Sequence, residues 1–179
     1  MPALRHKLAL AALATAAALV VPQAAAACEG EHADPHEVAL TTIRSATLCL
    51  INEERVTHGR SRLGARDQLK EAASRHSRSM DEHNYFSHDS PGGADVVDRV
   101  RRTGYLKGAG SWALGENIAW GSGSLATPAK IVEAWMNSSG HRDNILSRDF
   151  EHIGVGVARG APVAGIGDGA TYTTDFGRR

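Results

Sequence analysis

The sequence carries no excess of charge of either sign. Lysine and arginine together number 20, and aspartate and glutamate also number 20. Without a basic surplus there is little electrostatic attraction to phosphates, so we expect no nucleic-acid partner. The same balance gives no reason to expect adhesion to an anionic membrane. Beyond the N-terminus, no apolar run approaches the roughly 20 residues that a membrane-spanning helix needs, so we expect no transmembrane segment in the mature chain.

Several common catalytic motifs are also missing. There is no GxSxG nucleophile turn and no HExxH zinc-binding helix. Cysteine is scarce, and if Cys28 and Cys49 pair with each other, no thiol remains to act as a nucleophile. These absences argue against a serine esterase, a zinc protease of the helical type and a cysteine enzyme.

The N-terminus has the parts of a secretory signal peptide. Arg5 and Lys7 give a basic start, residues 8–21 are almost wholly apolar, and residues 24–27 are small. We therefore predict a signal peptide over residues 1–27, a secreted extracellular protein and one mature domain of about 150 residues. The alternative is an N-terminal buried helix or a membrane anchor, which the alanine-rich end disfavours.

The mature part is predicted to be a single domain without repeats. Residues 28–44 form an N-terminal segment that leads into the first helix, and residues 45–179 form the domain itself. Apolar periodicity predicts helices and alternation predicts strands. The expected helices are 37–58, 66–84 with Asp67 as its cap, 94–103, one that begins at Pro128, and one further turn over 141–146. The expected extended segments are 116–120, 153–157 and 172–176, with the last two paired antiparallel.

The two cysteines are expected to form a disulfide. Export places Cys28 and Cys49 in an oxidising compartment, and closing a loop of about 20 residues stabilises a fold by roughly 3 kcal/mol in the chain-entropy model. The bridge would tie the N-terminal segment to the first helix. The alternative is a lipid anchor on Cys28, but residues 25–27 lack the bulky aliphatic residue of such sites, and Cys49 would then be unpaired.

Three segments place a titratable residue where regular structure is expected to end. They are Tyr85-Phe86-Ser87-His88, Gly115-Glu116-Asn117-Ile118-Ala119, and the stretch from Trp135 to Leu146 that contains Gly140-His141-Arg142. Loops held by a rigid scaffold often carry functional groups, so His88, Glu116 and His141 are the candidate site residues. His76 differs from them, because it falls on the apolar stripe of its helix. We expect His76 to be packed and hydrogen-bonded rather than a ligand.

Together with Ile153-Gly154-Val155-Gly156-Val157 and the closing segment 172–177, these motifs resemble the CAP superfamily. This superfamily comprises cysteine-rich secretory proteins, antigen 5 and pathogenesis-related 1 proteins, and its bacterial SCP-like branch is the most similar. The resemblance covers residues 48–177, which is nearly all of the mature chain. It implies an α+β fold, a three-layer α-β-α sandwich with a central antiparallel sheet, in which the polar motifs converge on one cleft.

Many members of this superfamily have two histidines and two acidic residues in the cleft. The resemblance assigns His88, Glu116 and His141 to three of these positions. Ser138 stands where the second glutamate is usual. Glu133 is near in sequence, but it lies two residues before Trp135 and should point to another side of the helix, so it is not a replacement.

Two imidazoles in one cleft can bind a divalent metal such as zinc, with Glu116 or water completing the shell, and such a site is weak and exchangeable. The favoured interpretation is therefore a monomeric extracellular module that binds a small or lipid-like ligand, a cell-wall component or a protein. This interpretation requires no cofactor, and zinc at His88 and His141 would be an addition. The alternative is a metal-dependent hydrolase that uses His88, Glu116 and His141 as catalytic residues. A third interpretation treats the cluster as an internal brace.

Overall fold

The structure is a computed structural model that describes residues 28–179. The predicted signal peptide, residues 1–27, lies outside the described residues. Within residues 28–179, no helix combines the length and the apolar character that crossing a membrane requires.

A four-stranded sheet in the order β1-β3-β4-β2 forms the centre of the molecule. The predicted antiparallel pairing of the two C-terminal strands, β3 and β4, is confirmed. The first long strand, β2, also pairs antiparallel with β4. The very short first strand pairs parallel with β3. The strands are β1 (Gly64–Ala65), β2 (Ala113–Ser122), β3 (His152–Ala158) and β4 (Gly169–Arg178).

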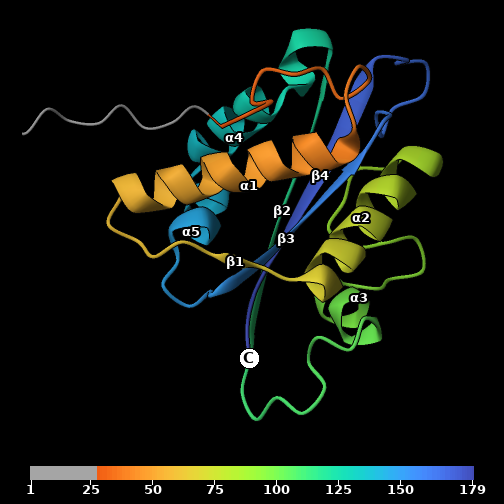
Figure 1. Ribbon diagram of the computed structural model, residues 1–179. Coiled ribbons are helices and arrows are strands. Elements are labelled where there is room, and N and C mark those ends of the chain that lie inside the picture. The colour runs from red at the N-terminus through yellow and green to blue at the C-terminus, as the bar shows by residue number, and fades with distance from the viewer. Residues whose placement is uncertain (1–27) are drawn as a thin grey trace, which may run out of the picture.

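Helices cover both faces of this sheet, as Figure 1 shows. One layer contains α1 (Leu40–Thr57), α4 (Pro128–Met136) and α5 (Ser139–Leu146), and the other contains α2 (Asp67–Glu82) and α3 (Val96–Arg102). A 3-10 helix, η1 (Gly123–Ala126), joins β2 to α4. The expected three-layer α-β-α sandwich is confirmed.

The larger core lies between the sheet and the layer of α1, α4 and α5. Trp135 is 1% exposed there, and its indole nitrogen donates to the carbonyl of Ile118 at 3.1 Å. This bond fixes α4 against β2. Phe150 stacks on Phe176 in the same core, at a distance of 5.5 Å between ring centroids.

On the opposite face, α2 packs directly on β3. A Cβ built on Gly154 would lie 2.0 Å from the Lys70 backbone nitrogen, and one on Gly156 would lie 2.2 Å from the Ala73 carbonyl carbon. The two glycines therefore allow the α2 backbone to approach β3 more closely than a side chain at either position would permit.

The sequence prediction was wrong at some element ends. Asp67 does not cap α2: it is the first helical residue and accepts a bond from the Lys70 ammonium at 2.6 Å. The strand expected at 116–120 extends over residues 113–122, because it pairs with β4 along this whole length. The turn expected at 141–146 is the eight-residue helix α5.

The expected disulfide is present. Cys28 and Cys49 are bonded, with 5.8 Å between their Cα atoms. The bond holds the N-terminal segment against α1. Because the Cys28 sulfur is committed to this bond, it has no thiol on which a lipid could be carried.

Candidate functional site

The centre of the site is a buried carboxylate on β2. The Glu116 side chain is only 3% exposed. Its Oε1 accepts a hydrogen bond from His88 Nδ1 at 2.7 Å, and its Oε2 accepts one from Arg99 Nη2 at 2.5 Å. A buried charge is tolerated when it is paired and hydrogen-bonded, and both conditions are met at Glu116.

Arg99 of α3 fixes the loop that carries His88 as well as Glu116 itself. Its Nη1 donates to the carbonyl oxygens of His88 at 2.7 Å and of Ala94 at 2.9 Å. The guanidinium is therefore shared between β2 and the loop between α2 and α3. Sequence reasoning missed Arg99, because it lies on a short helix next to Val100 and belongs to no recognisable motif.

His76 of α2 lies behind this pair. It is 1% exposed, and its Nε2 bonds to the carbonyl oxygen of Ser87 at 3.0 Å, so the expected packed and hydrogen-bonded histidine is what the structure shows. The same Nε2 is 4.0 Å from Glu116 Oε2. Burial lowers the pKa of His76, although the Glu116 charge opposes this effect. His76 is therefore a neutral part of the site's inner wall.

Asp175 of β4 is a second buried acid, which the sequence prediction did not assign to the site. It is 0% exposed and lies directly opposite Glu116 in the β2–β4 pairing. Neither of its oxygens has a donor among residues 28–179. Burial and the neighbouring Glu116 charge raise the pKa of Asp175 well above its ordinary range. A protonated carboxyl has an O–H of its own and no charge, so the raised pKa of Asp175 reduces the repulsion between the two buried acids.

The pKa shifts differ between the two acids, and they also differ between His88 and His141. Burial opposes ionisation of Glu116, but the bond from His88 and the charge of Arg99 together lower its pKa. The hydrogen bond to Glu116 raises the pKa of His88, whose side chain is 58% exposed. Burial, with a smaller contribution from the His88 charge, lowers the pKa of His141.

His141 is positioned by an amide network between β2 and α5. Asn117 Nδ2 donates to the His141 carbonyl at 3.0 Å, and Asn144 Nδ2 donates to the Glu116 carbonyl at 3.1 Å and to Asn117 Oδ1 at 2.9 Å. The Gly-Glu-Asn segment and α5 are thus locked together through their polar groups. The Nδ1 atom of His141 is buried and has no hydrogen-bond partner within residues 28–179.

The structure brings the sequence-predicted residues together to different degrees. His88 and Glu116 are in direct contact, whereas His141 is tied to the segment that carries Glu116. In the described part of the chain, the ligand atoms of His88, Glu116 and His141 do not all lie within 4.8 Å of one another. That spacing occurs for Cys28, Cys49 and Glu53, where the two cysteine sulfurs form the disulfide.

Neither residue considered for a second glutamate adds an acid to the cluster. Ser138 precedes α5 as its N-cap residue. Glu133 is occupied by an exposed ion pair with Lys130 at 2.7 Å. The second carboxyl beside Glu116 is that of Asp175, which comes from the sheet.

Comparison with known proteins agrees with the fold and the motifs. The family model for CAP, the cysteine-rich secretory protein family, matches residues 48–172. The chain belongs to this family. The solved structure of an extracellular protein containing an SCP domain from Bacillus anthracis str. Ames matches this CAP fold with a TM-score of 0.60 and 30% identity, over 79% of this chain and 44% of that one.

Two relatives from Bacillus subtilis (strain 168) are more similar in sequence. The uncharacterized protein YkwD is 40% identical over 115 residues, which is 64% of this chain and 42% of YkwD. The uncharacterized membrane protein YlbC is 40% identical over 119 residues, which is 66% of this chain and 32% of YlbC. This CAP chain therefore spans less than half the length of either relative.

Proposed function

We propose that this protein is an exported CAP binding module whose cleft, formed by His88, Glu116 and His141, takes a small or lipid-like ligand, a cell-wall component or a protein. Export is supported by the signal-like residues 1–27 and by the extracellular relative from Bacillus anthracis. The cleft also binds a divalent metal such as zinc, weakly.

Both carboxylate oxygens of Glu116 already accept hydrogen bonds, and this observation supports binding rather than catalysis. One oxygen accepts from His88 and the other from Arg99, and the side chain is 3% exposed. A general base must reach the proton that it removes, and it needs a free oxygen to accept it. Glu116 has neither property in this arrangement. It acts instead as a support that orients the His88 ring.

The residues fit a weak metal site. Glu116 holds Nδ1 of His88 and leaves its Nε2 as a ligand, which is the carboxylate–histidine arrangement common beside bound metals. The buried and unpartnered Nδ1 of His141 marks that ring as a second donor. A bound zinc ion would supply a Lewis acid at the cleft. Two protein ligands without a carboxylate make affinity low and exchange easy.

Zinc titration of the purified protein by calorimetry tests this assignment. We expect weak binding that is lost in both His88→Ala and His141→Ala. His58→Ala serves as the control, because His58 is an exposed histidine at the end of α1. Zinc binding that survives both cleft substitutions would remove the proposed metal site.

The hydrolase alternative is tested with the same variants. It predicts turnover of ester or peptide libraries that depends on added metal and is abolished by each cleft substitution. Such turnover would overturn the binding-module proposal. If the alanine variants lose only stability, with no change in metal or ligand affinity, the cluster is an internal brace.

A further inference from the structure

The edge of the sheet along β3 is only partly paired with another strand. β1 pairs with β3 through Gly64 and Ala65, and a hydrogen bond of 2.9 Å from the Arg66 N–H to the Ile153 carbonyl ends this pairing. The other side of β3 is occupied by β4 along its whole length. Hydrogen-bonding direction repeats every second residue in a strand, so the N–H and C=O of Val155 face the same edge as those of Ile153. Within residues 28–179, neither Val155 group has a hydrogen-bond partner on that edge.

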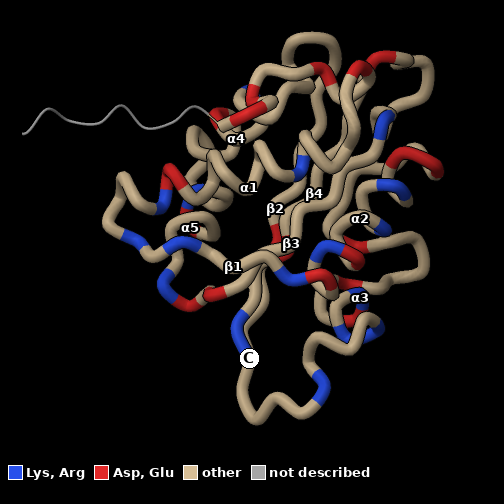
Figure 2. Tube along the Cα trace, in the orientation of Figure 1, with Lys and Arg blue, Asp and Glu red and all other residues tan. Residues whose placement is uncertain are grey.

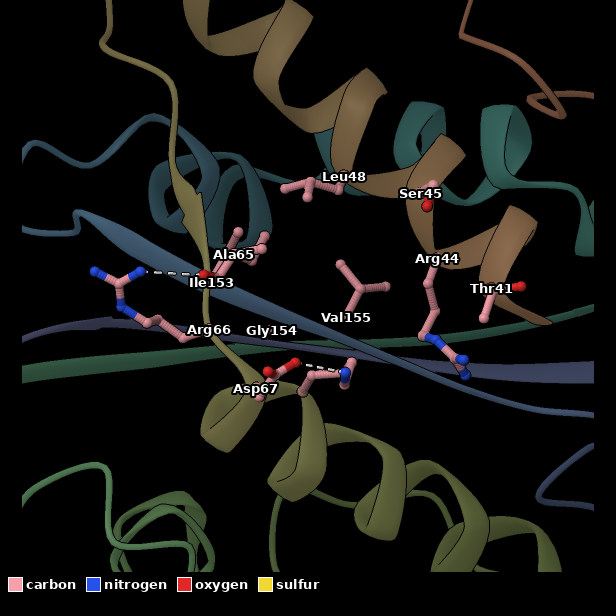
Figure 3. Close-up of a pocket in the computed structure, with 11 residues that line it drawn as sticks. Thr41, Arg44, Ser45, Leu48, Ala65, Arg66, Asp67, Ile153, Gly154 and Val155 are labelled. Atoms are coloured by element: carbon pink, nitrogen blue, oxygen red, sulfur yellow. Dashed lines mark hydrogen bonds and ion pairs between the residues drawn. The ribbon is translucent and has the colours of Figure 1, made fainter.

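A cavity of about 230 Å³ lies against this unpaired stretch, between α1 and α2 (Figure 3). We call it the edge groove. Its floor contains Gly154 and Val155, and its upper wall contains Leu48 and Ser45 of α1. An additional strand in this position would be the next neighbour of β3, about 4.8 Å away and flanked by the two helix layers. The groove therefore lies where an added strand would run.

The edge groove is positively charged, although acidic and basic residues are interspersed over the molecule as a whole (Figure 2). Arg44, Arg66 and Lys70 line it, against the single acid Asp67, which pairs with Lys70 at 2.6 Å. Arg66 Nη1 donates to the Ala65 carbonyl at 3.3 Å. The Arg44 guanidinium extends from α1 toward the strands, and within the described chain it forms neither a hydrogen bond nor an ion pair. Arg44 is thus a cation available to a ligand.

We propose that the edge groove binds an extended peptide segment that bears a carboxylate, added as a strand beside β3. The peptide backbone pairs with the N–H and C=O of Val155, its carboxylate pairs with Arg44, and an apolar side chain packs on Leu48. Adding a strand to an open sheet edge gives affinity through main-chain bonds, and flanking side chains give specificity. Glu116 lies on β2 at the opposite edge of the sheet, so this site is separate from the histidine cleft.

The test uses a short blocked peptide of alternating threonine and valine with one terminal aspartate, together with its asparagine counterpart. Affinity is measured by fluorescence anisotropy, and the bound position by amide NMR shifts. We expect the Val155 amide to shift and Arg44→Gln to weaken binding about tenfold. The asparagine peptide should bind the unmodified protein about tenfold more weakly than the aspartate peptide does. The two peptides should bind Arg44→Gln with equal affinity. Arg78→Gln, on the exposed side of α2, is the matched control and should leave affinity unchanged.

Absence of binding at millimolar peptide overturns the proposal. So does equal weakening by Arg78→Gln, or a set of shifts around Glu116 that leaves Val155 unmoved. Because the variants and probes differ from those of the zinc titration, failure at either site is distinguishable from failure at the other.

Discussion

Replacing Asp175 by asparagine should make this protein progressively more stable than the wild type as pH rises. Asp175 is fully buried and its pKa is raised by burial and by Glu116, so the folded protein keeps a proton that the unfolded chain releases. A raised carboxyl pKa stabilises the fold fully below the unfolded pKa, near 3.9, and this contribution is lost as pH rises toward the folded pKa. Asparagine does not titrate, and its amide supplies an N–H in place of the Asp175 O–H.

The magnitude follows from proton linkage. Each pH unit between the two pKa values removes about 1.4 kcal/mol of stability that the asparagine variant retains. The difference in unfolding free energy should therefore grow in favour of Asp175→Asn by about 1.4 kcal/mol for each pH unit above the unfolded pKa, until the folded pKa is reached. The offset at low pH depends on packing, whereas groups that titrate alike in both proteins cancel from the slope.

Urea unfolding followed by tryptophan fluorescence at several pH values measures this slope, since Trp135 is buried in the core. Asp149→Asn, which removes an exposed carboxyl, is the control against which the Asp175→Asn slope is compared. A pH-independent difference for Asp175→Asn would refute the reasoning, because it would show that the pKa of Asp175 is not raised in the fold.

Three further perturbations follow from the packing. Arg99→Gln leaves the buried Glu116 charge without its cation and should reduce the unfolding free energy by about 3–5 kcal/mol in urea titrations; a loss below about 1 kcal/mol would contradict the pairing. Gly156→Ala places a methyl group against the α2 backbone and should lower stability by about 1–3 kcal/mol, whereas Gly110→Ala, which has open space, should not. Replacing both Cys28 and Cys49 by serine should lower stability by about 3 kcal/mol and speed hydrogen exchange in the segment before α1; unchanged exchange there would argue against the bond.

Local patterns predicted the elements whose stabilising contacts are periodic along the chain. The stripe that contains Leu69, Ala72 and Met80 predicted α2, and all three residues are buried. Alternation predicted the cores of β3 and β4. The two-residue β1 escaped prediction, because it is defined by pairing with β3 rather than by its own residues. The full length of β2 escaped for the same reason.

The candidate site was also predicted only in part. His88 and Glu116 were found through their motifs, and the structure places them in contact. Arg99 and Asp175 were missed because nothing in their neighbourhood marks them. Asp175 occupies the strand face that also carries Thr173, whose hydroxyl accepts from Ser77 of α2. An acid on a strand face that packs against a helix indicates a buried polar neighbour. Only the register of β2 with β4 identifies that neighbour as Glu116.

This pairing changes what the missing glutamate at position 138 means for the cleft. Two carboxyls are present, but burial and the Glu116 charge raise the pKa of Asp175, and Arg99 pairs with Glu116, so the buried cluster adds little negative charge to the site. A cation in the cleft therefore gains little from long-range attraction and must rely on the imidazole donors of His88 and His141. The cluster holds the His88 ring in place without making the cleft acidic. A site with little negative charge suits an uncharged or apolar ligand better than a strongly held metal ion, which supports the binding-module proposal over metal-dependent hydrolysis.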